Sequence, residues 1–358
     1  MTGLDLIVIG GGPAGMMAAG TAASRGLRVL LLEKNPTLGR KLRITGKGRC
    51  NVTNDCSVEE AIAAIPGGGR FLYSAFSAFP PQATVAFFES LGVPLKTERG
   101  RRVFPVSDHA ADVAQALVSW LEAQHVTVRQ AAVTALLTED GRVAGVRAGG
   151  EDIFAPAVLL ATGGVSYPAT GSTGDGYALA RSVGHTVTPP QPSLVPLVED
   201  GDTCAALMGL SLKNTGVTVT AAGKKKPVFA DFGELLFTHF GLSGPTILSA
   251  SCHLRPMEPG KYTVHLDLKP ALSPEKLDAR LLRDLFANAN RQLSNALDEL
   301  LPQKLIPVVI ARSGVPGETR CHDLTREQRH ALAAVLKDFT IPIRGFRPIA
   351  EAIVTAGA

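Results

Sequence analysis

Residues 4–33, LDLIVIGGGPAGMMAAGTAASRGLRVLLLE, decide the fold of this chain. An apolar run over residues 4–9 ends in glycines, a segment of small residues at 14–24 predicts a helix, and residues 28–32 form a second apolar run. The order is therefore strand, helix, strand. It predicts a βαβ unit with a parallel sheet.

The turn after the first strand matches the spacing G-x-G-x-x-G. Gly10 permits the tight turn, Gly12 lets the backbone approach a diphosphate, and Gly15 lets the helix pack closely on the sheet. Glu33 stands eighteen residues after Gly15, where its carboxylate accepts hydrogen bonds from a ribose and repels a 2′-phosphate. A tight turn in any parallel sheet would explain the glycines alone, but the flanking strands and the acid favour a Rossmann-type site for an adenine dinucleotide.

A basic segment follows the second strand. Residues 39–51, GRKLRITGKGRCN, hold five cations within ten residues and no acid. This composition suits a second approach to phosphates or another polyanion, and it also suits a solvated basic loop. The glycines and Thr45 favour a backbone packed against a ligand. The candidate cofactor contacts in and beside this segment are Lys34, Arg40, Lys41, Gly46, Arg49, Cys50 and Asn51.

A second glycine-bearing turn follows a buried strand predicted at residues 158–161. The strand ends in the small residues Ala161, Thr162 and Gly163. They let the backbone turn pass close to a cofactor, or they form a plain turn that only ends the strand. The loop at residues 170–176 then precedes a helix and offers unpaired amides. This loop either faces a flavin ring or only caps the helix.

Length and composition predict two or three packed units, because 358 residues exceed what one hydrophobic core usually supports. Hydrophobic residues make up 45% of the chain and charged residues 19%, which excludes a disordered chain. The net charge of +4 permits a nucleic-acid partner without requiring one. Five widely spaced cysteines, no basic leader and no apolar run of membrane-spanning length predict a cytoplasmic protein that contacts no membrane. We predict no metal site, and the oligomeric state stays open.

The pattern of the chain changes after residue 190. Residues 1–190, with 345–358 returning to them, are predicted to form a Rossmann-like FAD-binding domain. Residues 191–270 alternate and carry β-branched side chains, which predicts a β-rich insert. Residues 271–344 predict a helical insert.

Local signals predict the elements inside these parts. Apolar runs at residues 127–137 and 142–148 flank a turn and predict a hairpin. Ser273 is an N-cap before a helix at residues 277–301, and Thr325 begins a capping box before a helix that ends at residue 339.

Five motifs together resemble the BaiN/YhiN-like family of FAD-dependent oxidoreductases, some of which carry an older aminoacetone oxidase label. They are the turn at residues 10–15 and the segments 39–54, 100–105, 161–176 and 233–245. The resemblance covers essentially the whole chain. It implies an α/β fold with a Rossmann-like FAD-binding domain of the two-dinucleotide-binding flavoprotein type, interrupted by a β-barrel plus helical insert.

The resemblance also implies site residues. Ala14, Glu33, Arg40 and Lys41 are expected to contact FAD, beside Pro13 of the glycine turn, and Val133 is expected to lie at the adenine. In this family the segment near residues 353–357 continues into a strand, a glycine-rich turn and a helix that close over the flavin. The present sequence stops at Ala358, so we expect the C-terminal part of the FAD-binding domain to be missing from it.

The activity implied by the resemblance is hydride transfer from flavin N5 to an activated C=C bond. The substrate that we predict first is uridine in large-subunit rRNA, which would be reduced to dihydrouridine. The alternatives are a small enone or steroid-like substrate, an amine oxidase activity, and a non-catalytic dinucleotide-binding regulatory protein. Because the sequence holds no second dinucleotide fingerprint, NAD(P)H is expected to act only as a transient reductant.

Such a reduction needs a proton donor at the other carbon. Cys50 is the first candidate, because neighbouring Arg49 and Lys47 are expected to lower its pKa. The alternative is that Cys50 is only a small buried hydrophobic residue. His239 is the second, in a glycine-rich loop that would suit an ordinary hydrogen-bonded histidine as well. Tyr167 is the third.

Overall fold

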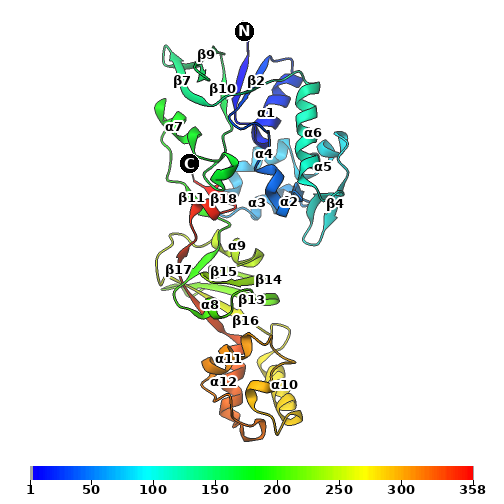
Figure 1. Cartoon of the computed structure of the whole chain (residues 1–358), viewed down its shortest axis with the longest axis vertical. Coiled ribbons are helices and arrows are strands. Elements are labelled where there is room, and N and C mark those ends of the chain that lie inside the picture. The colour runs from blue at the N-terminus through cyan, green and yellow to red at the C-terminus, as the bar shows by residue number, and fades with distance from the viewer. Residues whose placement is uncertain (1–2, 358) are drawn as a thin grey trace. The chain divides into compact units, whose positions relative to one another are not determined.

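The computed structural model describes residues 3–357, which form two compact units. The first unit reaches Gln191 and takes the chain up again at Thr355, and the second unit is Pro192–Val354. The segments in which the chain passes from one unit to the other are β11 (Gln191–Ser193) and β18 (Val354–Ala356), which pair in a two-stranded sheet (Figure 1). No helix in the described range is long and apolar enough to cross a membrane.

A four-stranded parallel sheet organises the first unit. Its order is β10-β1-β2-β6. The strands are β1 (Leu6–Ile9), β2 (Val29–Glu33), β6 (Thr127–Gln130) and β10 (Val158–Leu160). All five residues of β2 are buried, as expected for a parallel strand covered on both faces. The predicted strand, helix and strand of residues 4–33 are confirmed, and so is the fold class.

Two helices, α1 (Pro13–Ser24) and α6 (Ala110–Ala123), cover one face of this sheet. Their close packing depends on Gly20, because a Cβ at this position would lie 2.2 Å from the Trp120 ring. Small residues on α1 thus let a large aromatic side chain on α6 fill the interface.

The other face carries an antiparallel sheet and one short helix. The elements are β7 (Val133–Glu139), β8 (Arg142–Ala148), β9 (Glu151–Phe154) and α7 (Asp175–Ser182). Ile7 and Leu30 of the parallel sheet pack with Val146 and Leu179 in one cluster. The single strand predicted at residues 127–137 is wrong, because the chain leaves the parallel sheet after Gln130 and begins a different sheet at Val133.

The remaining α-helices and strands of the first unit lie in the single connection between β2 and β6, ahead of α6. They are α2 (Thr45–Gly48), β3 (Thr53–Asn54), α3 (Val58–Ala63), α4 (Tyr73–Ala78), α5 (Pro81–Ser90), β4 (Leu95–Glu98) and β5 (Arg102–Pro105). The three strands form a small sheet of order β3-β5-β4.

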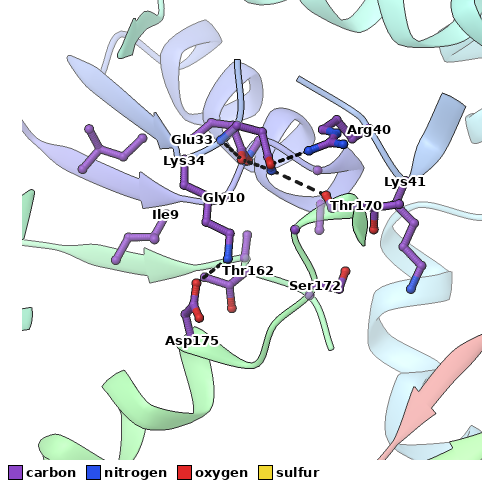
Figure 2. A pocket seen from close by; sticks show the side chains of 18 of the residues that line it. Ile9, Gly10, Glu33, Lys34, Arg40, Lys41, Thr162, Thr170, Ser172 and Asp175 are labelled. Carbon is purple, nitrogen blue, oxygen red and sulfur yellow. Dashed lines mark hydrogen bonds and ion pairs between the residues drawn. The ribbon is translucent and has the colours of Figure 1, made fainter. Parts of the chain in front are cut away.

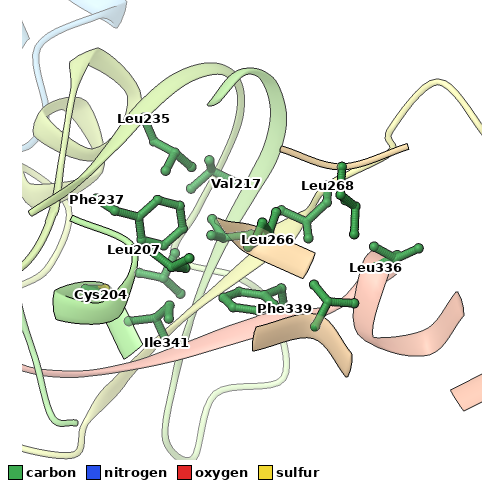
Figure 3. Packing of buried hydrophobic residues seen from close by; sticks show 14 of the residues in the cluster. Cys204, Leu207, Val217, Leu235, Phe237, Leu266, Leu268, Leu336, Phe339 and Ile341 are labelled. Carbon is green, nitrogen blue, oxygen red and sulfur yellow. The ribbon is translucent and has the colours of Figure 1, made fainter. Parts of the chain in front are cut away.

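A closed six-stranded barrel forms the centre of the second unit, in the order β12-β15-β14-β13-β16-β17. Its strands are β12 (Leu197–Glu199), β13 (Ser211–Ala221), β14 (Phe229–Thr238), β15 (Gly241–Ser243), β16 (Tyr262–Asp267) and β17 (Phe339–Phe346). Figure 3 shows Phe237, Leu266 and Phe339 meeting inside it. Strand β17 lies where the sequence predicted a helical insert. Its alternating Phe339 and Ile341 belong to the barrel interior.

Helices complete the second unit. They are α8 (Thr203–Ala206), α9 (Pro245–Ser251), α10 (Pro274–Ala287), α11 (Leu305–Ser313) and α12 (Arg326–Lys337). The predicted N-cap at Ser273 and the capping box at Thr325 are confirmed. The helix predicted to reach residue 301 ends at Ala287, because the side chain of Asn288 donates a hydrogen bond to the Asp284 carbonyl and competes with continuation of the helix.

Two glycines of the first turn offer a matched test of the packing. A Cβ at residue 15 would lie 1.8 Å from the Gly10 carbonyl oxygen, whereas a Cβ at Gly12 meets nothing within 4 Å. We expect Gly15→Ala to lower the free energy of unfolding by about 2 kcal/mol, the usual cost of overpacking. Gly12→Ala should cost under about 1 kcal/mol, as at an ordinary helix N-cap. Urea unfolding of the ligand-free chain measures both, and equal stabilities would contradict the packing argument.

Candidate cofactor-binding site

A cavity of about 310 Å³ lies at the carboxyl ends of the parallel strands. In its lining, Ile9 ends β1 and Gly10 follows it, Leu32 and Glu33 end β2, and Ala161 follows β10 (Figure 2). Ligands of open parallel sheets bind in this place, because loops diverge there and backbone amides face outward. The volume lies at the lower end of ligand pockets, roughly 300–1,000 Å³, and suits part of a dinucleotide.

The N-terminus of α1 faces this cavity. Gly12 is the N-cap and its backbone is extended, with φ −77° and ψ 178°, and no side chain caps the helix. Pro13 occupies the first helical position and has no N–H to leave unpaired. The free amides of the first turn and the helix dipole together favour an anion, and the empty space at Gly12 admits a diphosphate close to the backbone.

Glu33 is fixed by three hydrogen bonds. Its Oε2 accepts from the Gly11 amide at 2.6 Å, and its Oε1 accepts from the amide and the side chain of Asn35 at 2.7 and 2.6 Å. Glu33 as a whole residue is 9% exposed. A buried acid held at the end of the second strand is the arrangement that binds the ribose of an adenine dinucleotide.

Asn35 links the acid to its surroundings. Its Oδ1 accepts from Arg40 Nη1 at 2.8 Å, and its Nδ2 lies 3.5 Å from the Thr170 carbonyl oxygen. The sequence analysis missed this residue. The dipeptide Asn35-Pro36 is a turn signal that would have drawn attention to it.

Two lysines connect the cavity to the segment after β10. Lys34 Nζ donates to Asp175 Oδ2 at 2.5 Å, and this bond lowers the pKa of Asp175. Lys41 Nζ donates to the carbonyl and the hydroxyl of Ser166, each at 3.1 Å, and burial lowers the pKa of Lys41. Thr355 holds the same segment, because its Oγ1 accepts from the Val165 amide at 2.9 Å. Neither Asp175 nor Thr355 was predicted as a site residue.

Most of the predicted cofactor residues line this cavity. Those that do are Gly10, Gly12, Pro13, Ala14, Glu33, Lys34, Arg40, Lys41, Val133, Ala161, Thr162 and Gly163. Gly15 lies behind the turn, against the Gly10 carbonyl. Gly46, Arg49, Cys50 and Asn51 do not line it, so the structure divides the basic segment between two places.

A second cavity, of about 400 Å³, shares Pro13 and Ala14 with the first. Cys50 and Asn51 line it together with apolar side chains, among them Phe87. The loop before Cys50 is conformationally strained, since Lys47 and Cys50 both have φ 61°. Such left-handed residues cost about 1–3 kcal/mol and cluster at functional sites.

The expected lowering of the Cys50 pKa is wrong. Burial raises the pKa of this thiol, which is 1% exposed. Arg49 is turned to other partners, because its Nη2 lies 2.5 Å from Glu98 and 2.6 Å from Asp108. These acids come from distant segments, so the sequence gave no sign that they would neutralise Arg49.

The other two catalytic candidates are exposed. Tyr167 has φ 52°, and Lys41 Nζ lies 5.7 Å from the centre of its ring. His239 belongs to the second unit, in the turn between β14 and β15, where its ring packs edge-on against Phe240 at 5.0 Å. Across residues 3–357, no group of three or more His, Cys, Asp or Glu side chains is placed to hold a metal ion.

The position of Asn35 predicts an effect on ligand affinity. Asn35→Ala removes the side-chain hold on Glu33 and Arg40, so the Kd for an adenine dinucleotide should rise about tenfold, the value of one hydrogen bond to a charged group. Thr37→Ala is the control, because Thr37 lines the same cavity and its side chain makes no hydrogen bond to any residue between 3 and 357. Fluorescence titration with FAD measures both, and equal effects of the two substitutions would refute this role of Asn35.

The raised pKa of Cys50 predicts slow alkylation. At neutral pH the group stays a thiol, and the reactive species is the thiolate. Iodoacetamide should therefore label Cys50 at least about tenfold more slowly in the folded protein than in urea. Cys252, which is only half-buried, should react first. Peptide mapping by mass spectrometry gives both rates, and labelling of Cys50 as fast as Cys252 would contradict the burial.

Comparison with known proteins identifies the family. The model of the HI0933-like protein Rossmann domain matches residues 4–355. A 3-dehydro-bile acid delta(4,6)-reductase from Clostridium scindens is 31% identical over 98% of this chain and 85% of its own length. A ribosomal RNA dihydrouridine synthase from Escherichia coli is 29% identical over 100% and 86%, and one from Haemophilus influenzae is 28% identical over 87% and 75%. The chain therefore belongs to the HI0933-like Rossmann family, which confirms its resemblance to the BaiN/YhiN-like FAD-dependent oxidoreductases.

Proposed function

We propose that this protein uses FAD to reduce an activated C=C bond, and that the bond is that of uridine in large-subunit rRNA, which becomes dihydrouridine. One observation carries the proposal. The free amides at the start of α1 and the fixed carboxylate of Glu33 face one cavity at the carboxyl ends of the parallel strands. A diphosphate and its adjoining ribose need these two groups side by side.

The cavity suits the adenosine diphosphate half of FAD. Gly12 leaves open space where the diphosphate approaches, and Glu33 is held at the position of the ribose. Arg40 and Lys41 line the same cavity and supply positive charge. Val133 stands at the adenine end in this proposal. The remaining predicted contacts, Gly46, Arg49, Cys50 and Asn51, are proposed to hold the loop that borders the flavin.

Bound FAD, once reduced, supplies a hydride from its N5 atom, and the chain has to supply the proton for the second carbon. Cys50 is the first choice for that proton. Its raised pKa keeps the thiol protonated at neutral pH, and it lines the second cavity, which shares Pro13 and Ala14 with the first. Tyr167 and His239 are the further candidates. NAD(P)H is the proposed reductant of the flavin, and the proposed location is the cytoplasm.

A second candidate substrate is a small enone or steroid-like molecule. The apolar lining of the second cavity, which includes Met17, Phe87 and Leu117, favours such a ligand. The 31% identity to the bile-acid reductase from Clostridium scindens supports the same choice. The two relatives named as ribosomal RNA dihydrouridine synthases support uridine.

Turnover with two substrates tests the proposal. The FAD-loaded protein is mixed anaerobically with NADPH, and bleaching of the flavin is expected. In vitro transcribed large-subunit rRNA is then added, and mass spectrometry of the nucleosides should reveal dihydrouridine. Gly12→Ala should remain folded, bind FAD more weakly and form no product, because its methyl group occupies the space of the diphosphate. Cys50→Ala should keep the flavin spectrum and lose turnover.

Each alternative has its own result. Consumption of a steroid enone without any dihydrouridine would replace the RNA substrate by the enone. Bound flavin that NADPH never bleaches would favour the non-catalytic regulatory protein. Full turnover by Cys50→Ala would end the proton-donor role of that residue.

A further inference from the structure

A positively charged hollow lies in the second unit, outside both cavities described above. It has a volume of about 510 Å³ and is lined by Lys224, Lys225, Lys226, Pro227, Val228 and His253. The three lysines are exposed and stand in the turn between β13 and β14. None of them makes an ion pair with any residue in the described range.

The backbone of this turn is held in place. The Lys224 amide donates to the Ala221 carbonyl at 3.0 Å, and the Val228 amide donates to Val219 at 2.8 Å. A third bond, from the Ala222 amide to the Lys261 carbonyl at 2.8 Å, ties the turn to the start of β16. The side chains of the three lysines therefore start from a fixed platform on the barrel.

A histidine also lines the hollow. The ring of His253 lies 5.3 Å from the ring of Phe229, the first residue of β14, at an angle of 42°. No carboxylate lines the hollow. Glu258 forms an ion pair with Lys261, with 3.4 Å between Lys261 Nζ and Glu258 Oε1. Three adjacent ammonium groups repel one another, and an anion with several charges relieves that repulsion.

We infer that this hollow binds the phosphate backbone of RNA, an inference that rests on the proposed action on rRNA. Successive phosphates of one strand present charges at a spacing that three neighbouring lysines can follow. Lysine suits this task because its ammonium group is a mobile point charge that contacts phosphate without reading base sequence. The hollow thus provides affinity, and the chemistry of the first unit selects the nucleotide.

The covalent link between the two units lets RNA binding at the lysines assist binding of the same RNA by the first unit. Two short chain segments join the barrel unit to the cofactor unit, so RNA held by the lysines is present at a high effective concentration for the other unit. Removal of the lysines should therefore weaken RNA binding by the whole protein and leave the flavin chemistry intact.

Salt-dependent binding of RNA tests the inference. Fluorescence anisotropy of a labelled single-stranded fragment of large-subunit rRNA is measured with the full-length, FAD-loaded protein. The variant Lys224→Gln/Lys225→Gln/Lys226→Gln should bind at least about tenfold more weakly at low salt. The slope of log K against log salt should fall in size by about 2, since each neutralised phosphate of a single strand contributes roughly 0.7.

A charge-matched variant serves as the control. Lys276→Gln/Arg283→Gln/Arg326→Gln removes the same charge from exposed positions of α10 and α12 in the same unit. It should keep its affinity within about threefold and its slope nearly unchanged. The melting temperature and the NADPH bleaching rate of both variants should equal those of the wild type, which shows that folding and flavin binding are intact.

The outcomes separate the two proposals. Wild-type affinity in the lysine variant, or an equal loss in the control, overturns the role of the hollow and leaves the RNA substrate standing. A wild-type protein that bleaches with NADPH but binds no RNA overturns both the hollow and the RNA substrate. Tight binding through the lysines without dihydrouridine formation would instead retain the hollow and remove the proposed reaction.

Discussion

The contact between Gly15 and the carbonyl oxygen of Gly10 sets the distance of helix α1 from the parallel sheet. Gly10 is under a similar constraint, because a Cβ there would lie 2.5 Å from the Ala161 carbonyl oxygen. Three backbone segments therefore meet with no side chains between them. As a result the glycine turn lines the cavity without side chains, and the amides at the start of α1 face it directly. Glu33 is fixed beside them by the Gly11 amide and by the amide and side chain of Asn35.

The basic segment shows how similar charges acquire different roles. Arg40 and Lys41 turn to the first cavity, where Asn35 and Ser166 hold them. Arg49 pairs with two acids and stacks on Phe104, its guanidinium carbon 4.2 Å from the ring centre. These contacts of Arg49 anchor the loop that carries Cys50. Burial raises the pKa of that cysteine, so its thiol keeps its proton at neutral pH.

Local patterns explain what was predictable. The turn at Gly10, the acid at Glu33 and the helix caps at Ser273 and Thr325 depend on neighbours in the chain, and short-range rules find them. Interactions across long sequence separations escaped these rules. The partners of Arg49 lie 49 and 59 residues away, and Thr355 reaches a segment 189 residues before it. Strand β17 was missed for the same reason, since its partners β12 and β16 lie far upstream.

The closure of the barrel by β17 has a consequence for synthesis on the ribosome. All strands of the parallel sheet have been synthesised once residue 160 has emerged. By contrast, β12 and β16 lack one pairing partner until β17, residues 339–346, has been made. During that interval translation exposes two unpaired strand edges, which are templates for aggregation. The nascent chain is therefore most in need of a chaperone while α10, α11 and α12 are being made, and slow codons in that stretch would lengthen the hazard.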